Sequence, residues 1–152
     1  LLNDLEKVGN IWPNLNPSKD VLLHVGDLIS DIELSKLYNF HRRRKADMTV
    51  VAGVMEYKIP KGVMYHKQGN MTAYVEKPRI PIEYAMGIFI INKNLWKFVP
   101  KNQKFNIPDF INLLLSKGKK LCVYNHYGDF IQIDTNIDYK DAQEKMKSTH
   151  RD

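Results

Sequence analysis

The sequence predicts an α/β fold with a mostly parallel sheet that is flanked by helices and carries an inserted β-hairpin. Two apolar runs, "VLLHVG" (21–26) and "MTVVAGVM" (48–55), have the composition of buried strands and enclose a segment with helical spacing. This strand–helix–strand order is typical of a right-handed crossover between parallel strands. Two extended segments around the turn "QGN" (68–70) then predict the hairpin.

The first half of the chain supplies the crossover. Residues 1–8, "LLNDLEKV", predict a short helix before the first strand. We interpret the strand 21–26 as buried on both faces, so its His24 is expected to be a core histidine. Ser30 and Glu33 have the spacing of a capping box. Apolar residues then recur at helical spacing, at Leu34, Leu37, Tyr38 and His41.

The second half alternates strands with helices. The hairpin (62–78) is followed by a strand (84–92) and a short helix that Pro100 ends. A longer helix is predicted with Asn106 as its cap, Pro108 in its first turn and Gly118 at its end. Strands "LCVYNH" and "DFIQI" come next, and Thr135 with Asp138 opens the final helix.

Length and composition bound the class of protein. A chain of 152 residues with 43% hydrophobic residues predicts one domain, residues 1–152. It has no apolar run long enough to cross a bilayer and no signal peptide, so we expect no membrane partner. The single cysteine, Cys122, excludes an internal disulfide and suits a cytoplasmic protein. The chain also begins without methionine, and we expect it to be part of something longer.

The net charge of +6 could indicate a polyanionic partner. Much of the charge lies in "HRRRK" (41–45) at the end of a predicted helix, where cations complement the helix dipole. We therefore favour a solvated helix end and expect no nucleic-acid partner. A nucleic-acid module would bind with a steep salt dependence.

Asp27 follows the strand 21–26 directly, after Gly26. Ligands of open parallel sheets bind outside the carboxyl ends of the strands. A carboxylate there is a candidate ligand for Mg²⁺, which prefers oxygen donors and bridges to substrate phosphates. Position alone does not separate this role from that of a turn residue.

Glu76 and Lys77 end a strand that Pro78 stops. The lysine is a point charge suited to a phosphate, and the glutamate can accept hydrogen bonds from sugar hydroxyls. An ordinary charge pair at an exposed strand end explains the same pattern, and the residues alone favour that simpler interpretation.

Four segments in order carry a resemblance to a known family: "LLHVGDLISDIELSKLYNFHRRRKADMTVVAGV", "PKGVMYHKQGNMTAYVEKP", "YAMGIFIIN" and "GDFIQIDTNIDYKDA". From about residue 20 to 145 the chain resembles the sugar-1-phosphate nucleotidyltransferases, the Rossmann-like enzymes that make nucleotide sugars. The resemblance implies that a sugar 1-phosphate and a nucleoside triphosphate are the partners, with Mg²⁺ as cofactor. It also implies that the fold's first strands are absent and that this chain is the carboxyl-terminal two-thirds of the domain.

The resemblance assigns roles residue by residue. Asp27 matches the family's metal-binding aspartate and is the implied catalytic residue. Gly62 and Gly87 match glycines that line the sugar pocket. Glu76 matches a residue on sugar hydroxyls, and Lys77 matches the lysine on the sugar phosphate, a substrate-binding and catalytic role.

Two departures accompany the match. The family's glycine-rich nucleotide loop is absent, so we expect this chain by itself to be inactive. Gln132 occupies the position of the family's second metal-binding aspartate, and Gln is a poorer Mg²⁺ ligand than a carboxylate. Asp134 lies two residues further on the same face of the predicted strand and is the alternative ligand.

Two functions therefore stand open. The first is an enzyme that couples a sugar 1-phosphate to a nucleotide, of which this chain carries the sugar-phosphate half. The second is a non-catalytic regulatory or sugar-phosphate-binding homologue with a degraded metal site. The missing strands would leave an unpaired sheet edge, so the chain is expected either to associate, as in a homo-oligomer, or to be poorly stable. The base and the sugar cannot be read from the chain.

Overall fold

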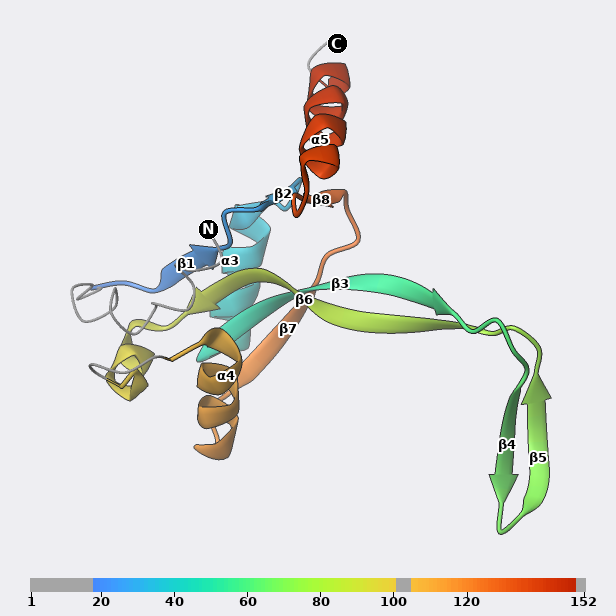
Figure 1. The fold of residues 1–152 in the computed structure, drawn as a ribbon. Coiled ribbons are helices and arrows are strands. Elements are labelled where there is room, and N and C mark those ends of the chain that lie inside the picture. Colours follow the sequence, from blue (N-terminus) through green and yellow to red (C-terminus); the bar gives the residue numbers. More distant parts are fainter. Residues whose placement is uncertain (1–17, 101–104, 150–152) are drawn as a thin grey trace.

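The computed structural model describes residues 18–100 and 105–149. Four strands form the central sheet in the order β1 (Val21–His24), β6 (Arg79–Ile91), β3 (Met48–Lys58) and β7 (Leu121–Asn125). Helices pack against this sheet, and a long ribbon of β3 and β6 projects from it (Figure 1). The α/β class predicted from the sequence is confirmed. The helix predicted for residues 1–8 lies outside the described residues.

The predicted parallel direction of the strands is found, but the predicted pairing between neighbours is not. β1, β3 and β7 run in one direction and β6 runs against them, because β6 pairs antiparallel with both β1 and β3 while β3 and β7 are parallel. The predicted parallel pairing of the strands 21–26 and 48–55 is wrong. β6 lies between these two strands, so two of the three neighbouring pairs in this sheet are antiparallel.

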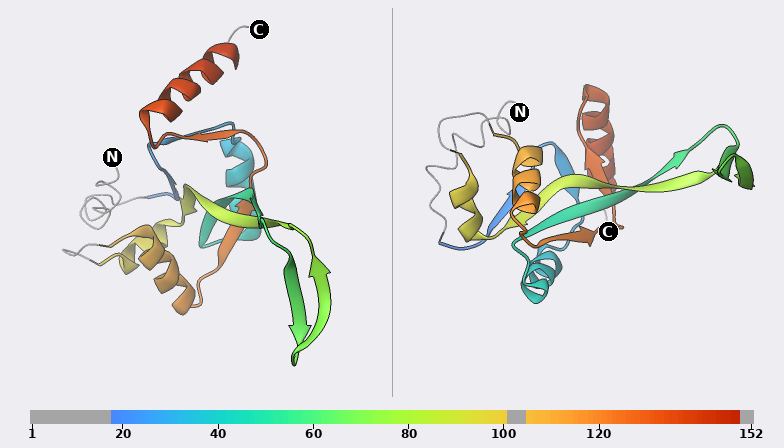
Figure 2. Two further views of the ribbon diagram at one scale, coloured as in Figure 1. Left: turned by 45° about the vertical axis from the view of Figure 1, so that its right-hand side comes forward. Right: turned by 90° about the horizontal axis from the view of Figure 1, so that it is seen from below.

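Helices cover both faces of the sheet. Alternation along β6 sends Phe89 and Ile91 into a cluster with η2 (Lys93–Phe98) and α4 (Ile107–Ser116). Ile88 and Ile90 face the other way, into a cluster that includes Leu37 of α3 (Leu34–Arg44). Figure 2 shows α3 and α4 on opposite sides of the strands. This three-layer arrangement explains the near-continuous apolar run of β6.

Two of the three predicted caps are confirmed. Asn106 caps α4, where its side chain accepts a hydrogen bond from the Asp109 N–H at 2.8 Å. Thr135 and Asp138 exchange hydrogen bonds at the start of α5 (Asn136–Thr149). The Ser30–Glu33 capping box is wrong. Ser30 is the last residue of strand β2 (Leu28–Ser30), so it is not free to cap a helix that begins four residues later.

The interpretation of β1 as buried on both faces is also wrong. Its residues alternate between half-buried and exposed, and Leu22 is 43% exposed. β1 is an edge strand with β6 as its neighbour in the described sheet. His24 is therefore exposed, and its ring nitrogen lies against the Val25 carbonyl oxygen instead of in a core.

The predicted hairpin is confirmed as β4 (Val63–Lys67) and β5 (Asn70–Val75), which pair antiparallel. It sits at the far end of the ribbon of β3 and β6 (Figure 1). β3 and β6 are longer than the sequence predicted, because residues 56–58 and 79–83 also pair. We call residues 54–82, the projecting ribbon with its hairpin, the arm.

A second projection lies on another side of the sheet. β2 pairs antiparallel with β8 (Phe130–Gln132), and α5 follows β8 (Figure 1). We call residues 27–31 and 128–146 the acidic corner, because seven carboxylates lie in these two segments against two lysines. Among the helices that the structure describes, none is long and apolar enough to cross a membrane.

Candidate functional site

Asp27 lies where the chain passes from β1 to β2. Its carbonyl oxygen accepts a hydrogen bond from the Ile133 N–H at 2.8 Å, and the next residue, Leu28, is paired with Gln132. The aspartate is half-buried. The sequence placed it at the end of a strand, and the structure adds that it faces the segment of Gln132, Ile133 and Asp134.

Gln132 and Asp134 belong to that facing segment. The Gln132 side-chain amide donates a hydrogen bond to Asp134 Oδ1 at 3.2 Å. The Asp134 main-chain N–H is held by the Asp138 carboxylate at 3.2 Å, within the cap of α5. Hydrogen bonds from the Thr135 hydroxyl and main chain lower the pKa of Asp138, so that carboxylate stays ionised and fixes the turn. The structure thus brings Asp27, Gln132 and Asp134 to one end of the β2–β8 pair.

The Mg²⁺ that the resemblance implies needs oxygen donors that lie close together. Among residues 18–100 and 105–149, no three His, Cys, Asp or Glu side chains lie close enough together to hold a metal ion. Mg²⁺ commonly takes one or two carboxylates and completes its shell with waters and substrate phosphates. Asp27 and Asp134 lie on facing segments and supply the two carboxylates of that smaller requirement, and the Gln132 amide donates a hydrogen bond to Asp134.

Gly87 is the third predicted site residue near this end of the sheet. Its φ of +81° is one that side chains rarely adopt. A Cβ there would lie 2.6 Å from the Val25 side chain, and the Gly87 carbonyl accepts a hydrogen bond from the Val25 N–H. Both facts give the glycine a packing reason, because it lets β6 pass close behind the segment that leads to Asp27.

Glu76, Lys77 and Gly62 lie on the arm instead. The Tyr74 hydroxyl donates a 2.5 Å hydrogen bond to Glu76 Oε2, which orients that carboxylate and raises the pKa of Tyr74. Lys77 has a φ of +47°, which turns the chain between β5 and β6, and both charged residues are exposed. Gly62 lies directly against the Tyr74 ring, so a side chain at this position would displace that ring.

The predicted site residues therefore form two groups within one copy of the chain. Asp27, Gly87, Gln132 and Asp134 lie near the acidic corner and the adjoining sheet. Glu76, Lys77 and Gly62 lie at the hairpin, which all three views place well away from β2 and β8 (Figures 1 and 2). The described structure does not bring these two groups together.

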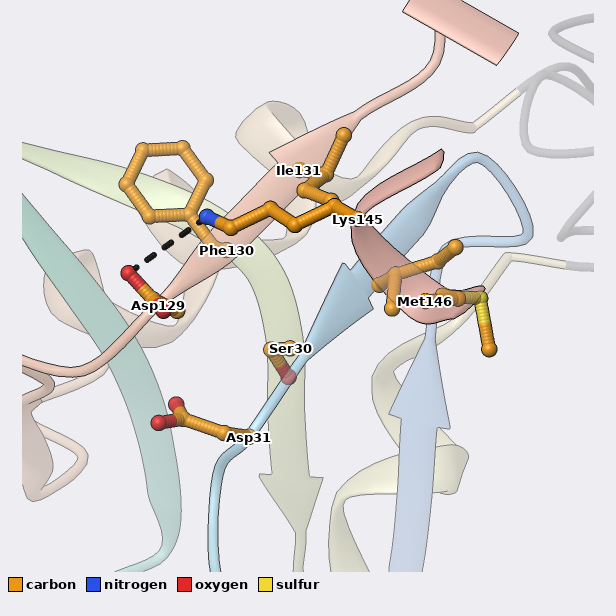
Figure 3. Close-up of a pocket in the computed structure, with 8 residues that line it drawn as sticks. Ser30, Asp31, Asp129, Phe130, Ile131, Lys145 and Met146 are labelled. Carbon is orange, nitrogen blue, oxygen red and sulfur yellow. Dashed lines mark ion pairs between the residues drawn. The ribbon is translucent and has the colours of Figure 1, made fainter. Parts of the chain in front are cut away.

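A cavity of about 290 Å³ lies between the β2–β8 pair and α5 (Figure 3). Phe130 and Met146 contribute apolar surface, Asp31 and Asp129 contribute carboxylates, and Lys145 Nζ lies 3.6 Å from Asp129 Oδ1. Sequence reasoning did not single out these residues. The signal was present, because each aspartate immediately flanks a short apolar strand.

Asp31 also lies 2.9 Å from His126 Nε2, an ion-pair distance. The histidine follows β7 and is largely buried, and its main-chain N–H is held by the Ala52 carbonyl at 2.8 Å. This pair connects the acidic corner to the parallel strands β3 and β7. The sequence treated His126 as one of five scattered histidines, and only the strand pairing reveals its partner.

Comparison with known proteins shows the family of the chain. Residues 11–144 match the sequence model of the nucleotidyl transferases. The chain belongs to the nucleotidyl transferase family. The chain is 31% identical over 143 residues to a glucose-1-phosphate adenylyltransferase of Bacillus subtilis, covering 83% of this chain and 38% of that protein. It is 34% identical over 76 residues to a mannose-1-phosphate guanyltransferase of Yarrowia lipolytica, covering 45% of this chain and 20% of that one. The resemblance to the sugar-1-phosphate nucleotidyltransferases is confirmed.

Solved structures confirm the fold. HddC from Yersinia pseudotuberculosis, complexed with GMP-PN, matches with a TM-score of 0.62 at 17% identity, over 93% of this chain and 61% of that one. The predicted Rossmann-like class is thereby confirmed. The chain spans less than half the length of the curated relatives that it matches.

Proposed function

We propose that the full-length protein transfers a nucleotidyl group from a nucleoside triphosphate to a sugar 1-phosphate, with Mg²⁺, and releases pyrophosphate. This chain contributes the sugar-phosphate half of the site and is inactive alone. The observation that carries the proposal is the family match over residues 11–144, which includes every residue that the resemblance assigned to the site.

The reaction is a displacement at phosphorus. A phosphate oxygen of the sugar 1-phosphate attacks the α-phosphorus of the triphosphate in line, the bond from that phosphorus to the bridging oxygen of the β-phosphate breaks, and pyrophosphate leaves. Such a transfer depends on positioning and on neutralising charge. A divalent cation held by Asp27 and Asp134 would neutralise phosphate charge there.

Residues of this chain also bind the sugar 1-phosphate. Lys77 supplies an exposed positive charge for the sugar phosphate, and Glu76, oriented by the Tyr74 hydroxyl, supplies an acceptor for sugar hydroxyls. The half-buried Asp27 lies on the segment that faces Gln132 and Asp134. The family resemblance and the chemistry of each side chain support these roles.

Replacing Asp27 tests the proposal most directly. In the full-length protein Asp27→Ala is expected to lower turnover by about 10²-fold or more, because one preorganised charge at the reacting phosphates is lost. The measurement is pyrophosphate release with glucose 1-phosphate and mannose 1-phosphate, each with the four common triphosphates. Asp141→Ala, which removes an exposed carboxylate from α5, is the matched control and should leave turnover unchanged. Unchanged release from Asp27→Ala would overturn the assignment.

Lys77→Ala is expected to act on binding. Loss of the point charge should raise the KM for the sugar phosphate by roughly tenfold while kcat changes less, as for a phosphate contact present before the reaction. Lys67→Ala, which removes another exposed lysine of the arm, is the control. An unaltered KM in Lys77→Ala counts against its role.

Gln132 favours the second candidate, a regulatory or sugar-phosphate-binding homologue without transferase activity. The neutral Gln132 amide donates a hydrogen bond to the Asp134 carboxylate, and this bond competes with a cation for Asp134. The same assays separate the candidates. A full-length protein that binds a sugar 1-phosphate but releases no pyrophosphate with any triphosphate is the binding homologue.

A further inference from the structure

Strand β8, which ends at Gln132, is held by little of the hydrophobic core. None of its residues is buried, and Phe130 contacts the Tyr84 ring at a centroid distance of 6.0 Å. Its partner β2 has one buried residue, Leu28, which lies in the cluster with Leu37 of α3. A two-stranded ladder as short as the β2–β8 pair is only marginally stable by itself. The orientation of this pair on the central sheet therefore depends on further contacts.

His126 and Asp31 provide such a contact, at the end of the pair away from Leu28. The Asp31 N–H donates a hydrogen bond to the Asp129 carbonyl at 3.2 Å, which extends the β2–β8 ladder beyond Ser30 (Figure 3). The His126 N–H donates to the Ala52 carbonyl at 2.8 Å, directly after the last pair of β3 with β7. The 2.9 Å approach of His126 Nε2 to Asp31 Oδ1 thus joins the end of one ladder to the end of the other.

The two side chains differ in their exposure to water. The His126 side chain is 10% exposed, and its Nε2 is buried without a hydrogen bond to any described residue. Such a buried polar atom is costly unless something compensates it, and the Asp31 carboxylate is the charge that lies beside it. The Asp31 side chain is 59% exposed, so the contact adds little to the stability of the whole fold. Its main consequence is geometric.

Gly128 shows that the chain is built closely around this contact. A Cβ at this position would lie 2.7 Å from Asp31 Oδ2 and 2.7 Å from His126 Cε1, and it would overlap Asp31 Oδ1. The φ of Gly128 is not positive, so its backbone conformation does not require a glycine. Space alone requires it, because the connection from β7 to β8 passes directly against the two side chains.

We propose that His126 is a positioning residue, which through Asp31 fixes the orientation of the β2–β8 pair on the central sheet. The contact lies at one end of the pair, and Asp27 and Asp134 lie at the other. Three residues of a strand span about 10 Å, so a tilt of the pair at the first end moves both carboxylates. Their use in holding a divalent cation rests on the proposed function, whereas the orientation of the pair does not.

Hydrogen exchange of the full-length protein tests the orientation without any ligand. His126→Ala removes the ring, and Gly128→Ala forces the two side chains apart. In each variant the amides of residues 27–33 and 128–134 should exchange about tenfold faster, while those of β3 stay unchanged. Asp129→Asn is the matched control, because it removes an 80% exposed carboxylate at the same strand end. Its exchange should equal that of the unaltered protein.

Cation binding tests the positioning of the two carboxylates. Mn²⁺ takes the same oxygen ligands as Mg²⁺ and can be titrated alone with detection by electron paramagnetic resonance. Its Kd should rise about tenfold in His126→Ala and stay unchanged in Asp129→Asn. In the transferase assay His126→Ala should lower kcat, whereas the KM for the sugar 1-phosphate should not change because Lys77 lies on the arm. A purely structural role would not separate these two constants.

The outcomes separate this proposal from the proposed function. Circular dichroism checks that each variant is folded. Unchanged exchange of residues 27–33 and 128–134 in both His126→Ala and Gly128→Ala overturns the proposal. Faster exchange with an unaltered Kd for Mn²⁺ overturns the positioning of the carboxylates. If the exchange rises but the unaltered protein binds no Mn²⁺, the metal role in the proposed function is refuted and the orienting contact stands.

Discussion

The four-stranded sheet with its helices and the arm share two strands but differ in what holds them together. Inside the sheet, β6 alternates between two apolar clusters, and Ile88 and Ile91 are fully buried. On the N-terminal side of Tyr84, residues 79–83 of the same strand pair with β3 just as regularly, yet their side chains are exposed. Main-chain hydrogen bonding is therefore common to both regions, and burial separates them. The ladder sets the direction of the arm, and its stability depends on what covers it.

The comparison predicts the largest difference for matched aromatic truncations. Phe110→Ala removes a fully buried ring from the α4 cluster and should cost about 3–5 kcal/mol of unfolding free energy. Tyr57→Ala on the arm, where the ring is 59% exposed, should cost under about 1 kcal/mol in the monomer. Urea unfolding of dilute protein measures both. Equal costs would break the comparison by showing that the arm is packed.

Two glycines provide the next contrast. Both have positive φ, +81° at Gly87 and +85° at Gly69, but a Cβ at Gly87 meets Val25 whereas one at Gly69 meets nothing within 4 Å. Gly87→Ala should therefore cost about 2–4 kcal/mol from strain and overpacking, and Gly69→Ala about 1 kcal/mol from strain alone. Thermal unfolding of the two variants checks the ranking. A larger loss for Gly69→Ala would contradict it.

The smallest expected effect is on the pH dependence of stability, and it comes from His41, a buried residue of α3. Burial lowers the pKa of His41 below its ordinary 6.5, Arg42 acts in the same direction, and Asp20 and Asp47 oppose it. The unfolded chain therefore binds more protons, so stability is complete above pH 6.5 and falls as the pH drops through 6.5 toward the lower folded pKa. The loss is at most about 1.4 kcal/mol per pH unit for one group.

His41→Gln should flatten this part of the pH–stability curve, measured by urea unfolding between pH 7 and 5. His24→Gln is the control, since that ring is exposed on the edge strand. The His41 ring also forms a 2.8 Å hydrogen bond with the buried Thr49 hydroxyl, so the overall stability of His41→Gln should fall at every pH. An unchanged slope would show that His41 does not titrate differently in the folded chain.

Several features of this protein were open to prediction because their causes are local. Asn106 and Thr135 have the chemistry of caps, and the glycine of "QGN" (68–70) allows the tight turn of the hairpin. The order of the four motifs was sufficient to indicate the family, which the match over residues 11–144 confirms. The assigned roles of Asp27 and Lys77 stay predictions.

Other features were decided only by the tertiary structure. The apolar sequence of β1 predicts a buried strand. Whether a strand is central or at an edge depends on its neighbours, however, and in the described sheet β1 has β6 as its one neighbour. Ser30 has a capping side chain, but pairing with Phe130 placed it in a strand.

The sequence by itself determined which residues are candidates for the chemistry, because carboxylates, lysines and glycines are recognisable from type and spacing. The tertiary structure decided which of them meet. β2–β8 pairing brings Asp27 opposite the segment of Gln132 and Asp134, and the His126–Asp31 contact links residues 95 positions apart. The same pairing rules extended β3 and β6 into an arm that holds Lys77 away from Asp27. Strand pairing is long-range and depends on the whole sheet, so no local pattern reports it.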